Sequence, residues 1–233
     1  MKLLPANRMP QPARRAFTLI ELLVVISIIA VLAAFILPLA GSVNRVKKID
    51  TAQAELQKIE TMLENYKAKT GTYPPSSGNL VVTNALFYEL SGVTNDGTYY
   101  RPLDGSLPTL ITDFKNRSGL GGVVNSTKGG GDETVYAKDF LPDLKANQFV
   151  SSTNTPGGSP YYYLVTSVGG PDASYQPLSG TSGNPFRYLY PGVNNPSSYD
   201  LWVQLSINST PTSPHFYLIC NWSQQTIRNS PLP

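Results

Sequence analysis

The most reactive side chains in this sequence are a single cysteine, Cys220, and a single histidine, His215, five residues apart. One cysteine excludes a disulfide framework and a four-thiolate metal site, and one histidine excludes an all-histidine zinc centre. His215 lies in an aromatic run and is interpreted as a core or sheet-face histidine, and Cys220 as a buried, inert thiol. The acidic residues show no spacing that suits acid–base catalysis. The sequence therefore predicts a protein that is not an enzyme, with no cofactor and no metal site.

Glu21 indicates a different kind of chemistry, because it stands at the entrance of a long apolar run. Residues 22–40 contain no charged side chain. An ionised carboxylate beside such a run is costly unless a cation pairs with it. The next downstream cation, Arg45, is about 36 Å away along a helix, whereas Arg15 or a new amino group at Phe17 would be close. Glu21 is therefore expected either to pair with a positive group or to reach into membrane headgroups beside Arg15.

The apolar run has the length of a membrane-spanning helix. As a helix, residues 22–40 extend about 28 Å, close to the roughly 30 Å of a bilayer's hydrocarbon core. A cleaved secretory signal is the alternative, but its apolar core is usually shorter, and Leu39-Ala40-Gly41-Ser42 is a poor cleavage site. Residues 1–16 carry four basic and no acidic side chains, whereas the whole chain has a net charge of +3. Because the basic excess lies in this leader, no nucleic-acid partner is predicted.

Residues 14–26, Arg-Arg-Ala-Phe-Thr-Leu-Ile-Glu-Leu-Leu-Val-Val-Ile, resemble the prepilin processing and methylation motif of type IV pilins and of the pseudopilins of type II secretion. The resemblance implies that a prepilin peptidase cuts between Ala16 and Phe17 and methylates the new amino group of Phe17. It also implies that Glu21 is the filament-assembly glutamate and that the helix bends or melts near Pro38. The sequence departs from the family at Ala16, where glycine is usual.

The same resemblance implies an organisation and a location. Residues 1–16 would be the leader, 17–41 a transmembrane helix that becomes the filament core, 42–69 its amphipathic continuation, and 70–233 an extracytoplasmic globular domain. The chain would be a single-pass protein of the bacterial inner membrane, with a cytoplasmic amino terminus and a periplasmic domain. Its expected partners are the prepilin peptidase, the membrane, other copies of itself and related subunits, and an inner-membrane assembly platform.

After the apolar run, hydrophobic residues recur every three or four positions between Val43 and Tyr66. This spacing predicts an amphipathic helix with one apolar stripe. The helix is expected to stop near Lys69, because Gly71 is a suitable capping residue and Pro74 cannot continue it. We expect the stripe to pack on the sheet that follows rather than to form a coiled coil.

The remaining part, residues 70–233, is poor in charge and contains 13 of the 14 tyrosines. This composition predicts short strands and long loops, and hence an α+β fold in which a long amino-terminal helix packs on a small antiparallel sheet. Residues 91–160 are interpreted as an insertion into a compact pseudopilin domain. Strands are predicted at 161–168, 186–190, 199–205 and 215–222, and short helices at 84–90 and 139–146.

Residues 184–201 resemble the carboxy-terminal hairpin of major pseudopilins, and residues 71–74 resemble the point at which that family leaves its long helix. Major pseudopilins often bind calcium in an acid-rich loop after this hairpin. Residues 201–233 contain no Asp or Glu, whereas calcium requires several oxygen ligands that usually include carboxylates. No calcium site of that kind is predicted, and Asp200 is interpreted as a turn or strand-end residue.

Several functions stay open at this point. The leading hypothesis is a filament subunit, a pseudopilin of a type II secretion system, and the pilin of a type IV pilus would share the motif. A second hypothesis is a membrane-anchored domain that binds carbohydrate or protein without forming filaments, through exposed tyrosines at 161–163. A third is a secreted enzyme with a removable signal, which requires cleavage near Gly41.

Overall fold

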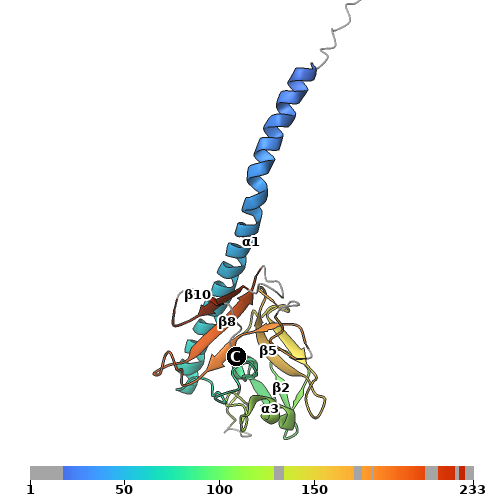
Figure 1. Cartoon of the computed structure of the whole chain (residues 1–233). Coiled ribbons are helices and arrows are strands. Elements are labelled where there is room, and N and C mark those ends of the chain that lie inside the picture. Colours follow the sequence, from blue (N-terminus) through green and yellow to red (C-terminus); the bar gives the residue numbers. More distant parts are fainter. Residues whose placement is uncertain are drawn as a thin grey trace, which may run out of the picture. The chain divides into compact units, whose positions relative to one another are not determined.

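A single helix, α1, connects the apolar run to the amphipathic stretch in the computed structural model (Figure 1). It extends from Leu19 to Thr70. The structure describes residues 18–128, 134–170, 175–179, 181–207, 215–223 and 226–228, without the side chains of 35–42 and 226–228. The chain separates into two compact units, residues 1–44 and 45–233. Pro38 falls within α1, and a bend at this residue stays a prediction.

The end of α1 is set by the residue that follows it. Gly71 has a φ of 84°, in the left-handed region, and its backbone N–H donates to the Lys67 carbonyl at 2.8 Å. This single bond is the αL cap, which satisfies a carbonyl that the last turn would otherwise leave unpaired. The predicted stop near Lys69 is therefore confirmed to within one residue.

Three small antiparallel sheets, rather than one, follow the helix. The first has the order β1-β2-β3, the second β10-β9-β8-β7 and the third β4-β5-β6. The first contains β1 (Val93–Asn95), β2 (Tyr99–Pro102) and β3 (Thr109–Leu110). The second contains β7 (Arg187–Leu189), β8 (Asp200–Ser206), β9 (Phe216–Cys220) and β10 (Thr226–Arg228). The third contains β4 (Phe149–Ser152), β5 (Tyr161–Thr166) and β6 (Asn184–Pro185).

The main core lies where the apolar stripe of α1 meets these sheets. The stripe residues that are buried are Ile49, Ala52, Leu56, Ile59, Leu63 and Tyr66. They share one hydrophobic cluster with alternate residues of β8, namely Leu201, Val203 and Leu205. Figure 1 shows β8 and β10 alongside the carboxy-terminal part of α1, and β5, β2 and α3 further along the same unit. The stripe thus packs on a sheet, as its short periodic stretch predicted.

Glu55 adds a polar connection between α1 and the third sheet. Its carboxylate accepts hydrogen bonds from the Thr166 hydroxyl at 2.6 Å, the Ser167 hydroxyl at 2.6 Å and the Gln148 amide at 3.2 Å. Hydrogen bonds to a charged acceptor are stronger than those between neutral groups. The end of β5 is therefore held on the helix by directional contacts as well as by apolar packing.

Of the two short helices that the sequence predicted, one is present and one is wrong. The first corresponds to α2, Leu86–Ser91. The second, over residues 139–146, is a series of turns. Asp139 accepts a hydrogen bond from the Leu141 backbone at 2.7 Å, and Pro142 lacks an N–H. An aspartate that bonds to the backbone two residues later favours a turn over a helix.

The third helix, α3 (Ile111–Ser118), and the strands β1 to β4 fall in the region that we interpreted as an insertion. They form part of the unit that spans residues 45–233. The backbone of Phe140 donates to the Leu90 carbonyl at 2.7 Å, and Phe114 is fully buried. Whatever its evolutionary origin, this region contributes side chains to the main core.

Candidate functional site

The described part of the chain begins with a capping box built from Thr18 and Glu21. The Thr18 backbone N–H and its hydroxyl each donate to Glu21 Oε2 at 2.8 Å, and the Glu21 N–H donates to the Thr18 hydroxyl at 3.3 Å. This reciprocal pattern satisfies donors that the first helical turn leaves unpaired. This role of Thr18 was not predicted, although the Thr-x-x-Glu spacing before an apolar run is itself a signal for this cap.

The cap fixes Glu21 without using all of its hydrogen-bonding capacity. Both bonds end on Oε2, and Oε1 accepts none from the part of the chain that the structure describes. The side chain also lies in the first turn of α1, where the partial positive charge of the helix favours an anion. The arrangement therefore presents a pre-positioned, solvent-accessible carboxylate oxygen that can accept a second, external donor.

The helix around this carboxylate exposes its apolar side chains on all sides. Between residues 19 and 32, every leucine, isoleucine and valine is exposed by 45% or more. An apolar surface of this length is unfavourable in water and indicates burial against lipid or other protein. By the criteria of length and apolar character together, no helix in the described ranges qualifies as a membrane span.

The leader cleavage site lies outside the described residues. Ala16 and Phe17 immediately precede the first described residue, Thr18. Cleavage after Ala16 and methylation at Phe17 stay predictions, as does the assembly role of Glu21.

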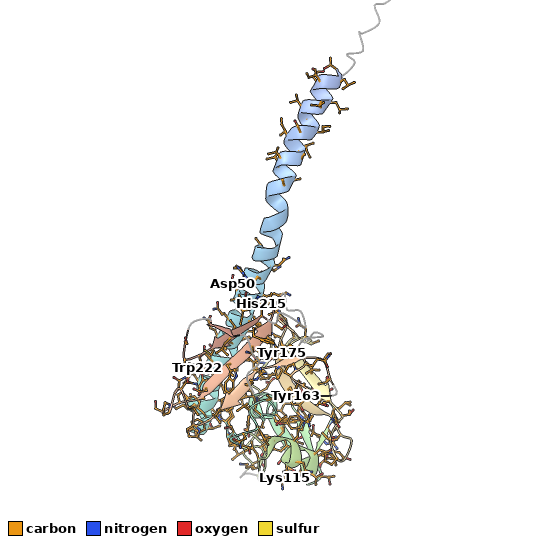
Figure 2. All side chains as sticks on the ribbon, viewed as in Figure 1. Asp50, Lys115, Tyr163, Tyr175, His215 and Trp222 are labelled. Atoms are coloured by element: carbon orange, nitrogen blue, oxygen red, sulfur yellow. The ribbon has the colours of Figure 1, made fainter. Side chains whose placement is uncertain are left out.

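The cysteine and histidine occupy different environments at the two ends of β9. Cys220 is a buried thiol whose Sγ lies 3.5 Å from the Ser223 carbonyl oxygen. His215 precedes the first residue of β9 and is exposed, which corrects its interpretation as a core or sheet-face residue. The aromatic residues that follow it belong to the strand, whereas His215 lies one residue before it, where its carbonyl accepts from the Ile207 N–H at 3.3 Å and its side chain is exposed. Figure 2 labels its position.

The tyrosines at 161–163, considered above as exposed binding residues, are buried. Tyr161, Tyr162 and Tyr163 have exposed fractions of 5% or less. Tyr162 stacks on Phe87 of α2 with ring centroids 4.9 Å apart, and Tyr161 packs near Phe114 of α3. Since elements cover both faces of β5, these side chains form core rather than a ligand surface.

Asp200 has the strand-end position that its sequence context indicated, at the first residue of β8. Its carboxylate accepts from the backbone N–H groups of Val193, Asn194 and Asn195 at 2.8 to 2.9 Å. These bonds organise the loop between β7 and β8, in the hairpin that resembles that of major pseudopilins. The Asp200 carboxylate thus gives these three N–H groups the acceptor that backbone carbonyls supply in a regular helix or strand.

The comparison with known protein families identifies the amino-terminal segment. Residues 12–37 match the family model described as the prokaryotic N-terminal methylation motif. This motif is the hallmark of type IV pilin-like and pseudopilin proteins, and it confirms the resemblance seen in the sequence. No curated protein and no solved structure matches the chain. The motif supports a type IV pilin-like protein that a prepilin peptidase processes.

Proposed function

We propose that the chain is a structural subunit of a pilin-like filament, and specifically a pseudopilin of a type II secretion system, rather than an enzyme. The observation that carries the proposal is the methylation motif, placed on a helix whose apolar residues are exposed on all sides. The segment 184–201, in which β7 pairs with β8, resembles the carboxy-terminal hairpin of major pseudopilins and supports the secretion role over that of a pilus subunit.

In this proposal, residues 17–41 are stored as a helix across the bacterial inner membrane, with the amino terminus in the cytoplasm and residues 70–233 in the periplasm. An assembly platform then moves the helix from lipid into a bundle of copies. Contacts between apolar helices replace contacts with lipid. The Glu21 carboxylate neutralises the methylated amino group of Phe17 in a neighbouring subunit, and this buried pair sets axial register more than it adds stability.

The capping box allows a sharp test of that ion pair. Glutamine satisfies the third helical position of a capping box as glutamate does, so Glu21→Gln keeps the cap and removes the charge. Glu21→Ala removes both. We expect both variants to insert in the membrane, and both to lose filaments in a sedimentation or electron-microscopy assay by at least tenfold. Filaments from Glu21→Gln at the wild-type level would show that Glu21 acts only as a helix cap.

Processing is checked on the wild-type protein in the same experiment. Mass spectrometry of the mature amino terminus should find a chain that starts at Phe17 and carries one methyl group, about 14 Da above the unmodified mass. A chain that starts at Met1, or beyond residue 40, would contradict the proposal. The second of these results would instead support a secreted protein with a removable signal.

A further inference from the structure

A polar groove of about 450 Å³ lies between α3 and the loop that follows β4. Its lining consists of Asn116, Arg117, Asn154, Thr155 and Pro156. The volume falls within the range of small-ligand sites. Of the lining residues only Pro156 lacks a polar side chain, so the groove suits a ligand with many hydrogen-bonding groups and little apolar surface.

Arg117 is held in place by the core beneath it. Its Nε donates to the Tyr163 hydroxyl at 2.6 Å, and its guanidinium carbon lies 5.9 Å from the centre of the Tyr163 ring. Tyr163 is itself buried, with 2% of its surface exposed. This contact uses only Nε, and the two terminal nitrogens make no hydrogen bond within the part of the chain that the structure describes. A guanidinium fixed in this way presents two parallel donors, the geometry that recognises a carboxylate.

The acid that would ordinarily pair with Arg117 is engaged elsewhere. Asp113 lies four residues earlier on α3, the spacing at which an aspartate and an arginine attract each other. Its carboxylate instead accepts from the Gly157 N–H at 2.7 Å and the Ser159 hydroxyl at 2.6 Å. Burial acts to raise the pKa of Asp113, but the hydrogen bonds from Ser159 and Gly157 outweigh it and lower the pKa. Among the described residues, Arg117 makes no salt bridge.

Two asparagines accompany Arg117 in the lining of the groove, and a second cation of the same helix lies outside that lining. Asn116 and Asn154 line the groove, and their side-chain amides make no hydrogen bond within the described ranges. Each amide offers two donors and an acceptor, which matches the hydroxyl groups of a sugar. Lys115 is exposed on the same helix. It lies at the opposite end of the 45–233 unit from Asp50 (Figure 2).

We propose that this groove binds an acidic sugar, in which Arg117 pairs with the carboxylate of a uronic acid and Asn116 and Asn154 bind its hydroxyl groups. A peptide carboxylate also matches Arg117, and its backbone groups match the amides, so the tri-aspartate peptide in the test below separates the two ligands. The proposal goes beyond a filament role, because it assigns a ligand to the globular part of the chain. It does not depend on processing at Phe17 or on assembly through Glu21.

The test is a calorimetric titration of the detergent-solubilised full chain with trigalacturonic acid. Arg117→Gln should weaken binding at least tenfold, because a charge-assisted, two-point contact is lost. Arg117→Lys, which keeps the charge but not the fork, should also weaken it. The matched control is Lys115→Gln, which removes the same charge from the same helix outside the groove and should change the affinity less than threefold.

Three results would overturn the proposal. The first is no binding of trigalacturonic acid at millimolar concentration. The second is an equal effect of Arg117→Gln and Lys115→Gln, which would indicate general attraction by the surface charge. The third is that neutral maltotriose or a tri-aspartate peptide binds as tightly as trigalacturonic acid. Binding of maltotriose would show that the groove does not recognise a carboxylate, and binding of the peptide would show that it does not recognise a sugar. Circular dichroism of each variant verifies that the fold is retained.

Discussion

Among individual residues, Glu89 is an ionisable group that the fold holds entirely away from water. It lies on α2 with no exposed surface. Its carboxylate accepts from the Tyr66 hydroxyl at 2.8 Å and from the backbone N–H groups of Val124 and Asn125 at 2.8 and 3.0 Å. Burial raises the pKa of Glu89, although these bonds and the charge of Lys128 act to lower it. One side chain therefore joins α1, α2 and the 123–128 loop.

This burial predicts a pH dependence of a definite sign. The folded protein binds the Glu89 proton more tightly than the unfolded chain does, so the stabilisation is fully present below the ordinary pKa of 4.5 and is lost as pH rises through the raised pKa. Over that interval the slope approaches about 1.4 kcal/mol per pH unit. Glu89→Gln removes the ionisable group. We expect this variant to have a free energy of unfolding about 1 to 3 kcal/mol lower at acidic pH, because the backbone N–H groups of Val124 and Asn125 lose an acceptor oxygen.

The measurement is the difference in free energy of unfolding between wild type and Glu89→Gln, from denaturant titrations at several pH values between 4 and 8. Taking the difference removes the contributions of groups that titrate equally in both proteins. This difference in free energy of unfolding should become smaller as pH rises above 4.5. A gap that stays constant over the whole range would contradict a raised pKa for Glu89.

At the scale of elements, the carboxy-terminal cap of α1 depends on the backbone of Gly71. An added Cβ at this position would meet nothing within 4 Å, so the φ of +84° is the sole obstacle to a side chain. Gly71→Ala should lower the free energy of unfolding by about 1 kcal/mol, because alanine is strained in the left-handed region. Thermal or denaturant unfolding measures the change.

Gly121 provides the matched control for this substitution. It also has open space around an added Cβ, but its φ lies outside the left-handed region. Gly121→Ala should leave the stability unchanged or raise it slightly, because alanine reduces the conformational entropy of the unfolded chain. Equal losses in the two variants would show that the backbone conformation at Gly71 is not what stabilises the end of the helix.

Elements with strong local signals could be predicted from the sequence, whereas those defined by distant partners could not. The apolar period and Gly71 specify where α1 packs and ends, and alternating aromatic residues indicate β7, β8 and β9. By contrast, β3 is two residues long and exists because Tyr99 pairs with Leu110. The tyrosines at 161–163 were considered as exposed binding residues, but packing of α2 and α3 on β5 buries all six residues of the strand.

The same distinction holds for the two candidate sites. Glu21 was predictable because an acid beside an uncharged run demands a partner, and this reasoning requires only the sequence. The groove at Arg117 was not, because it needs α3 and the loop after β4 to meet across about 40 positions of sequence. It also requires that Asp113 accept from Ser159 instead of pairing with Arg117. No sequence motif predicts either contact.

At the scale of the whole molecule, every buried hydrophobic residue of the described part lies at position 49 or later. The unit of residues 45–233 thus contains the entire described core and should fold without the part of α1 that precedes residue 45. We expect this fragment to be soluble and to unfold in one cooperative transition, with a near-ultraviolet circular dichroism signal from its packed tyrosines. A fragment that exposes its core, with a broad transition and no such signal, would contradict this division.

A shorter fragment, residues 64–233, supplies the control. It lacks five of the six buried stripe residues of α1, namely Ile49, Ala52, Leu56, Ile59 and Leu63, as well as Glu55 with its bonds to Thr166 and Ser167. The lost burial amounts to about 10 kcal/mol, which is comparable with the total stability of a typical domain. This fragment should not fold. The two truncations together therefore locate the boundary within α1: the globular unit needs the residues after it, and the residues before it are left for contacts with lipid or other subunits.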